Sequence, residues 1–390
     1  MSSFNTSKSQ EIGSLPPGLK HEFITVNSIT APSFGSNFTI RTTEKGYIQD
    51  ATLVFNVGAV AGYTGTNANV APRFSPTHFW FQKIELVQSG EVIQVIYPDA
   101  NWLKTQLYTK EDDRLVLNYA SGIYSSQSNR YSMAITTSNY YLPLRSLFNE
   151  TYLPILTDNQ AIEFRVWMQP LANLVTTTGL TVTTLTSSIN SCSVILKMTK
   201  LPSEQLAKEA QAIMKVPKHL RFHEARYVQG TALSGITSYT LPLTNIVGKV
   251  ASMYFIVRPS ASMTLDNVFS YSDILSFEIR DGGGTNIVGG QAIYSLYNRT
   301  IMSQHFNRSF YLLDVPSAIS NSYVFQYSWS VNPFDATNNG KSQSYRTFQG
   351  SENLIINWSS ALGANTDITA FFCTQCYVEQ SGSGTKRIYA

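Results

Sequence analysis

The chain has 390 residues, of which 43% are hydrophobic and only 14% are charged, and its net charge is +3. So small a charge, without a basic run interleaved with aromatics, argues against charge-driven binding of nucleic acid. No apolar stretch reaches the ~18 residues of a membrane-spanning helix, and the N-terminal residues lack the apolar core of a secretion signal. We therefore expect a soluble, non-exported protein with two domains.

The composition favours β-structure. The chain contains 22 Tyr, 21 Phe and 5 Trp, and long stretches are rich in Ser, Thr and Asn. Aromatic and β-branched residues suit half-buried strands. Because few charges remain to cover the exposed surface, we expect much of that surface to contact other copies of the chain. The three cysteines, Cys192, Cys373 and Cys376, are too few for a disulfide scaffold and indicate a reducing compartment.

The first half reads as a series of strands after a polar N-terminal arm. Alternating or apolar segments predict strands at 23–30, 36–42, 47–57, 140–148, 153–156, 161–168 and 192–198. A hairpin is predicted within His78–Leu103, where Ser89-Gly90 supplies the positive φ of a tight reversal. We expect a short helix at 99–108, a charged turn at 109–113, and loops at 58–73 and 120–139.

A single convincing helix is predicted at Ser203–Val216, between the two halves. Ser203 is expected to cap it and Pro217 to stop it, and an apolar stripe runs along Leu206, Ala210 and Ile213. An isolated amphipathic helix in this position indicates a linker that lies against one of the domains.

The second half contains a weaker copy of the first hairpin. Asp273–Leu296 repeats the acid between apolar residues, and aligning Glu278 with Glu85 gives an offset of 278 − 85 = 193 residues, about half the chain. Asp281-Gly282 is expected to form its turn. Further strands are predicted at 238–243, 249–257, 322–332, 351–358 and 367–378, and a loop at 333–341.

These observations predict an all-β protein made of two tandem eight-stranded jelly-roll sandwiches joined by a helix. The expected parts are an N-terminal arm (1–20), a first jelly roll (21–200), the linker helix (201–217), a second jelly roll (218–379) and a C-terminal tail (380–390).

Several blocks resemble the double jelly-roll major capsid proteins of the lineage that joins tailless membrane-containing bacteriophages, adenoviruses and large eukaryotic DNA viruses. The blocks are Ile84–Leu86 with Gly90 and Asn101–Leu103, then Tyr141–Leu144, Leu153–Ile155, Ala161–Trp167 and Tyr327–Pro333. They occur in the family's order, with a helix between the halves. The chain departs from the large-virus members by being short, and it lacks their apolar C-terminal block.

The resemblance implies a structural role. Three subunits would close into a pseudo-hexameric homotrimer that tiles an icosahedral DNA virus shell. The implied partners are the chain itself, neighbouring capsomers, minor capsid and vertex proteins, and an internal membrane contacted through terminal arms. The implied location is the virion shell, assembled inside the infected host cell. No sequence-specific nucleic acid is expected as a partner.

We expect no catalytic, cofactor-binding or metal-binding residues. His21, His78, His219, His223 and His305 are scattered, so a cupin-type metal site is not indicated. His219 and His223 with Cys373 and Cys376 make a formal zinc set. However, positions three apart on a strand point to opposite faces, which favours buried thiols instead. The glycines at 282–284 and 382–386 lack the ending of a phosphate loop.

Two alternatives remain open. The first is a double-sandwich glycan-binding spike or lectin-like module, in which the pairs Trp80/Phe81 and Tyr327/Trp329 line a sugar site. The second is an enzyme of the two-jelly-roll amidase type, which would require a pair of acids in a cleft, and no such pair is evident.

Overall fold

The computed structural model describes residues 20–64, 72–109, 111–122, 132–176, 180–260, 271–298, 323–330, 344–382 and 384–389. These residues form two compact units. Among them, the first unit comprises 20–222 together with Cys376–Tyr389, and the second comprises 223–330 and 344–375. None of the helices in the described part of the chain is both long and apolar enough to cross a membrane.

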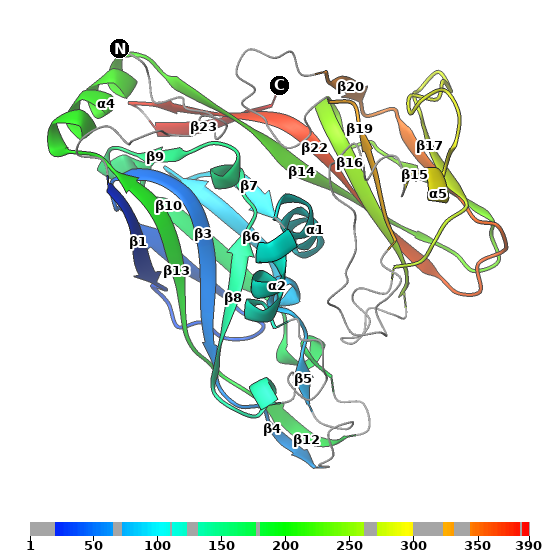
Figure 1. Ribbon diagram of the computed structural model, residues 1–390, viewed down its shortest axis with the longest axis horizontal. Coiled ribbons are helices and arrows are strands. Elements are labelled where there is room, and N and C mark those ends of the chain that lie inside the picture. Colours follow the sequence, from blue (N-terminus) through cyan, green and yellow to red (C-terminus); the bar gives the residue numbers. More distant parts are fainter. Residues whose placement is uncertain are drawn as a thin grey trace. The chain divides into compact units, whose positions relative to one another are not determined.

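The first unit contains two antiparallel sheets (Figure 1). In one, the strands lie in the order β1 (Lys20–Asn27), β13 (Ile189–Lys200), β3 (Gly46–Val57) and β8 (Ser138–Leu144), and β9 (Leu153–Ile155) pairs with the start of β3. In the other, the order is β2 (Asn37–Thr42), β10 (Ile162–Met168), β6 (Phe81–Gln88) and β7 (Glu91–Ile96). Two short ribbons extend the unit: β4 (Ala61–Thr64) with β12 (Thr181–Thr186), and β5 (Arg73–Phe74) with β11 (Val175–Thr176).

The second unit repeats this arrangement. One sheet has the order β14 (Lys218–Ala232), β22 (Thr366–Ser381), β16 (Val247–Pro259) and β19 (Val324–Ser328), with β20 (Arg346–Gln349) on the start of β16 and β23 (Gly384–Tyr389) on β22. The other has the order β15 (Ser238–Pro242), β21 (Asn353–Asn357), β17 (Ser276–Arg280) and β18 (Ile293–Tyr294).

Comparing the two units strand by strand confirms the predicted duplication. In chain order, β1, β2, β3, β6, β7, β8, β10 and β13 correspond to β14, β15, β16, β17, β18, β19, β21 and β22. Even the extra strand recurs, since β9 and β20 each pair with the beginning of the third jelly-roll strand. The eight-stranded pairing pattern of a jelly roll is therefore present twice.

The predicted hairpins are both present, but their turns differ. Ser89 and Gly90 have φ angles of 54° and 83°, as the predicted tight reversal requires. In the second hairpin the positive φ lies at Gly284 (82°), two residues after the expected Gly282. The Asp281 carboxylate accounts for the shift, because it accepts backbone N–H bonds from Gly283 (3.0 Å) and Thr285 (2.9 Å) and so forms a longer turn.

The structure confirms the helices at α1 (Pro98–Tyr108) and α4 (Ser203–Lys215), and it corrects three predictions around them. The segment expected to be a charged turn runs into α2 (Glu111–Ala120), which the sequence did not predict. Pro202, not Ser203, occupies the cap of α4, because its carbonyl accepts the first helical bond from Leu206. Residues assigned to a C-terminal tail belong instead to the end of β22 and to β23.

Each sandwich encloses its own aromatic core. In the first unit Trp80 packs against Phe55, Phe74 and Tyr140, with ring centroids 4.7–5.9 Å apart across this group. The strand β10 alternates buried and half-buried residues along its length, as a strand with one face in a core must. α4 lies against this unit as expected, with Ile213, Leu206 and Ala210 packed around Tyr47 and Leu156.

A buried asparagine fastens the helix between the fifth and sixth jelly-roll strands in both units. In α1, Asn101 donates to the Pro143 carbonyl (2.9 Å) and accepts from the Arg145 N–H (2.7 Å). After β18, Asn298 follows the short helix α5 (Ser295–Tyr297), donates to the Gln326 carbonyl and accepts from its N–H (3.1 Å). Each asparagine side chain thus bonds to one backbone C=O and one backbone N–H, as a neighbouring strand would.

These asparagines predict matched losses of stability. Replacing Asn101 or Asn298 with alanine should lower the free energy of unfolding by about 1–3 kcal/mol, because two buried backbone groups lose their partners. Chemical denaturation measures the effect. The control is Asn190→Ala, which removes only exposed side-chain bonds to Asn56 and Ser188 and should cost less than about 0.5 kcal/mol. Equal effects at all three positions would contradict this role.

Candidate assembly surfaces

The histidines and cysteines lie apart from one another. His21 contacts Thr199, and the Nε2 atom of His219 lies 2.9 Å from Glu379 Oε2. His78, His223 and all three cysteines are buried, while His305 lies outside the described residues. Within the described ranges, no three His, Cys, Asp or Glu side chains are grouped so that they could hold a metal. Burial raises the pKa of the Cys192 thiol, which keeps it protonated and unreactive.

His78 belongs to a buried polar cluster beside α1. Its Nδ1 accepts a hydrogen bond from Asn101 Nδ2 (3.1 Å), and its ring packs edge-on to Trp102. Burial, with a smaller contribution from the Arg145 guanidinium, lowers the pKa of His78 from 6.5 to about 3. The imidazole therefore remains neutral near pH 7. In the same region, the Lys104 ammonium lies 3.6 Å from the buried Glu150 carboxylate.

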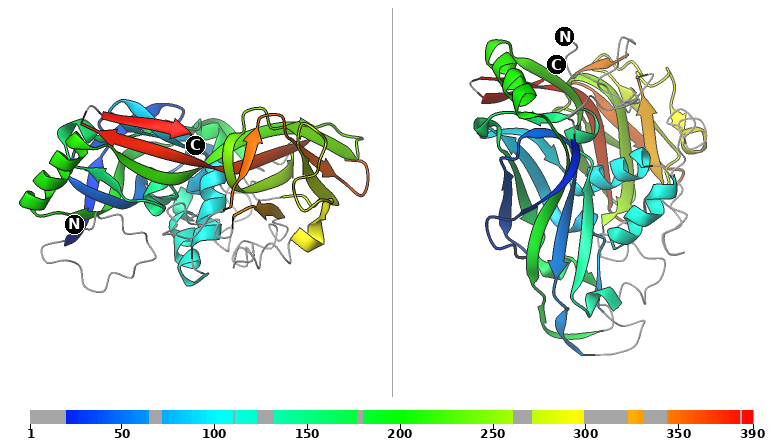
Figure 2. Two further views of the ribbon diagram at one scale, coloured as in Figure 1. Left: turned by 90° about the horizontal axis from the view of Figure 1, so that it is seen from above. Right: turned by 60° about the vertical axis from the view of Figure 1, so that its left-hand side comes forward.

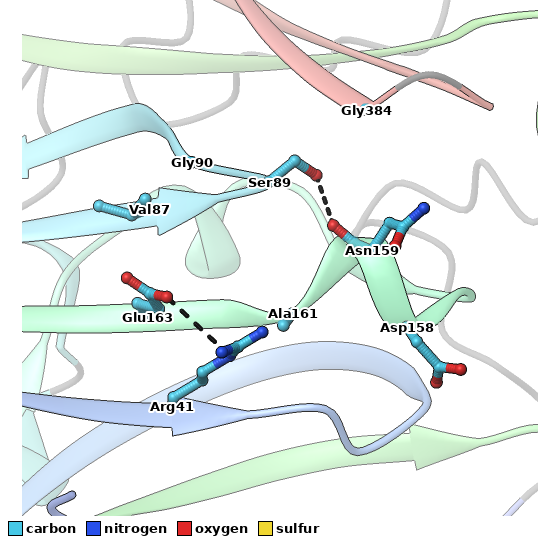
Figure 3. Close-up of a pocket in the computed structure, with 9 residues that line it drawn as sticks. All are labelled: Arg41, Val87, Ser89, Gly90, Asp158, Asn159, Ala161, Glu163 and Gly384. Atoms are coloured by element: carbon cyan, nitrogen blue, oxygen red, sulfur yellow. Dashed lines mark hydrogen bonds and ion pairs between the residues drawn. The ribbon is translucent and has the colours of Figure 1, made fainter.

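A polar pocket of about 360 Å³ opens beside the first hairpin turn (Figure 3). Arg41 and Glu163 form an ion pair of 3.9 Å on one side, and Ser89 Oγ donates to the Asn159 carbonyl (2.7 Å) on the other. Asp158 lies at the opposite end of the pocket from Glu163 and pairs with Lys45 at 3.1 Å. Each carboxylate thus has a basic partner, and the two are not arranged as a catalytic pair.

The second unit exposes a group of apolar side chains around α5. We call Leu275, Tyr294, Leu296 and Tyr297 the α5 patch; their side chains are 43–75% exposed. The backbone holds them together, since Ser295 N–H donates to the Leu275 carbonyl at 3.1 Å. Exposed large apolar residues gathered in one place are typical of contact surfaces. This patch was not predicted from the sequence, although the uncharged run Ile293–Tyr297 is a usable signal.

The corresponding position in the first unit is differently built. There α1 is a longer helix whose residues 101–106 are buried. Among the described side chains nearby, Val116 and Tyr119 on α2 are exposed; they lie three positions apart and so share one helical face. We call these two residues the α2 patch. Among the described residues, the two units therefore expose different apolar groups between the fifth and sixth jelly-roll strands.

The lowered pKa of His78 predicts a specific pH dependence. Between about pH 3 and 6.5 the unfolded chain binds a proton that the folded chain excludes, so stability is full above 6.5 and falls as the pH drops through this window. In His78→Gln, which keeps an acceptor for Asn101, the free energy of unfolding should fall less steeply from pH 6.5 to 5, by up to about 1.4 kcal/mol per pH unit.

Chemical denaturation at a series of pH values measures these slopes. Asn190→Ala, at an exposed residue without a titratable group, is the control and should keep the wild-type slope. Parallel slopes for wild type and His78→Gln would show that His78 does not titrate differently on folding.

The sequence matches no family model and no curated protein. Solved structures, by contrast, match nearly the whole chain. The structure of PBCV-1 VP54 fitted into a reconstruction of the virophage Sputnik has a TM-score of 0.71 at 12% identity, covering 97% of this chain and 98% of that one. The Faustovirus major capsid protein has a TM-score of 0.68 at 9% identity, covering 94% and 91% respectively.

The mavirus major capsid protein has a TM-score of 0.55 at 10% identity, covering 100% of this chain and 93% of its own. At such low identity the likeness establishes the fold. Together with the repeated strand order, it confirms at the level of the fold the resemblance seen in the sequence: this chain is a double jelly roll.

Proposed function

We propose that this chain is the major capsid protein of an icosahedral DNA virus and forms pseudo-hexameric homotrimers. The observation that carries the proposal is the near-complete coverage, in both directions, of structures titled as major capsid proteins. The match includes both jelly rolls, which we assign to residues 21–200 and 218–375, with 376–389 completing the first. The chain would act in the virion shell after assembly inside the host cell.

The duplication gives a geometric reason for a trimer. Three chains supply six similar sandwiches, and cyclic closure through contacts between unlike units yields a six-sided outline from a threefold axis. A six-sided building block packs side by side in a shell. Contacts with neighbouring capsomers, minor capsid and vertex proteins, and with an internal membrane through the N-terminal arm, belong to the same proposal.

The unlike apolar surfaces support such a contact. We place the α5 patch of one copy against the α2 patch of the next, because a contact between the first and second units closes a ring. The side chains that define the two patches carry no charge, so their own burial removes no charge from water. A stable interface typically buries about 1,200–2,000 Å² in total, and apolar burial contributes about 25 cal/mol per Å².

The proposal makes burial at interfaces, not catalysis, the working principle of the protein. In the polar pocket at the first hairpin, both carboxylates are paired with basic side chains, Glu163 with Arg41 and Asp158 with Lys45. The alternative of a glycan-binding module is tested by the same assembly measurement, since such a module would act without closing into a ring.

Light scattering on the purified chain tests the proposal. The trimer should have a mass of about 130 kDa, three times the 43.4 kDa of one chain. It should persist on dilution into the nanomolar range, as a large apolar interface implies. A monodisperse monomer at micromolar concentration would overturn the proposal, and one that binds a glycan array would favour the lectin-like alternative.

The α5 patch predicts an assembly-defective variant. Leu296→Glu places a charge at a side chain that is 75% exposed in the chain alone, so the monomer should keep its stability. In the trimer the charge would be buried, and the trimer should weaken by at least tenfold. The matched control is Thr240→Glu, an equally new charge at an exposed position on β15. A Leu296→Glu variant that assembles like this control would remove the α5 patch from the interface.

A further inference from the structure

The end of the chain contributes to the core of the first unit. Residues Cys376–Ser381 at the end of β22 pair in register with β23, from Cys376 opposite Tyr389 to Ser381 opposite Gly384. Cys376 and Val378 are fully buried in the same apolar cluster as Phe55 and Trp80. The first jelly roll is therefore incomplete until residues near position 380 have been made. We call Cys376–Tyr389 the C-terminal hairpin.

Buried hydrogen bonds fasten this hairpin to the first sandwich. Gln380 Nε2 donates to Gln88 Oε1 (2.7 Å) and to the Pro154 carbonyl (3.2 Å). Gln88, at the end of β6, donates in turn to the carbonyls of Pro154 (3.2 Å) and Gln160 (3.0 Å). Thr385 Oγ1 adds a further bond to Gln88 Oε1 at 3.1 Å. Gln380 and Gln88 are both 0% exposed, so neither can exchange these partners for water.

The turn of the hairpin is also closely seated. Gly382 lies against α4, where an added Cβ would come within 3.2 Å of the Met214 Cα atom. The views in Figure 2 agree in placing the β22–β23 hairpin beside α4. At the first hairpin turn, the hydroxyls of Ser89 and Thr385 lie 3.2 Å apart, and Gly384 borders the same place in Figure 3.

These contacts join residues that lie far apart along the chain. Gln88 and Gln380 are 292 residues apart, so Gln88 is synthesised long before the segment that Gln380 fastens. Until it docks, Gln88 lacks two of its partners and the apolar surface around Cys376 and Val378 is uncovered. Exposed apolar surface in an incomplete sandwich is prone to wrong association.

We propose that the C-terminal hairpin is a strap that closes the first jelly roll, so that the chain becomes competent to assemble only after residues 376–389 have been made and have docked. The strap has open and closed states, and the Gln380–Gln88 bond favours the closed one. Only the assembly step rests on the proposed capsid function; the closure of the first unit is independent of it.

Hydrogen exchange of the full chain tests closure directly. In Gln380→Ala, amides of β6, β7 and β9 should exchange about tenfold faster, because their protection depends on the closed strap. Amides of β17 and β21 in the second unit should be unchanged. The matched control is Gln375→Ala, the same substitution five positions earlier on β22, where the residue belongs to the second unit; it should leave β6 and β7 protected.

A disulfide between the strap and the first hairpin turn should rescue closure in the Gln380→Ala background. In a Ser89→Cys/Thr385→Cys variant carrying Gln380→Ala, a disulfide formed by mild oxidation should restore slow exchange of β6 and β7. Reduction of that disulfide should abolish the protection again. The same variant should form the wild-type oligomer when oxidised and lose it when reduced, measured by light scattering.

Two results would contradict the proposal that the C-terminal hairpin is a strap. One is unchanged exchange of β6 and β7 in Gln380→Ala; the other is assembly of the reduced triple variant as complete as that of wild type. Failure of the capsid proposal is distinguishable, because it would appear as a monomeric wild type whose β6 and β7 still depend on Gln380 for protection.

Discussion

Aromatic packing between two sheets is the interaction on which the structure depends. In the first unit Phe55 on β3 contacts Phe38 on β2, the opposite sheet, and Trp80 at the entrance to β6. In the second unit Phe255 on β16 makes the equivalent contact with Phe277 on β17, with ring centroids 5.1 Å apart. A sheet has one apolar face and must bury it, and the simplest partner is another sheet of the same chain.

This packing also determines which side chains remain exposed on the surface of each unit. Once the aromatic faces are enclosed, the other face of each strand is left to polar and charged side chains, such as Glu163 and Arg165 on β10. The helices between the fifth and sixth strands then distinguish the two units, since α1 is buried whereas the residues around α5 are exposed. Two sandwiches with the same interior thus have different exteriors, which is the property that a ring of alternating units requires.

Much of the fold was predictable because it depends on local patterns. Ser89-Gly90 predicted the turn of the first hairpin, and alternating apolar residues predicted strands such as β10. The acid between two apolar residues, which occurs at both Glu85 and Glu278, indicated the duplication. The repeat Ile96-Tyr97 to Asn101, matched by Ile293-Tyr294 to Asn298, was equally readable, but its role became clear only when both asparagines were seen bonded to the sixth strand.

The remaining features depend on distant contacts. α2 begins with a run of acids typical of a turn, and its place is set by packing next to β8. The last residues of the chain look like a Gly/Ser tail, yet Gln380 finds its partner 292 positions away, a pairing that no local pattern encodes. The α5 patch was missed for another reason: apolar residues on a strand and helix predict burial, and only the fold shows that these are exposed.

Electron microscopy of the purified, full-length chain tests the central claim most directly. If two equivalent jelly rolls per chain meet around a threefold axis, class averages should show particles with a six-sided outline and threefold symmetry, in which two kinds of lobe alternate. Particles with only two lobes, or with a symmetry other than threefold, would contradict the account.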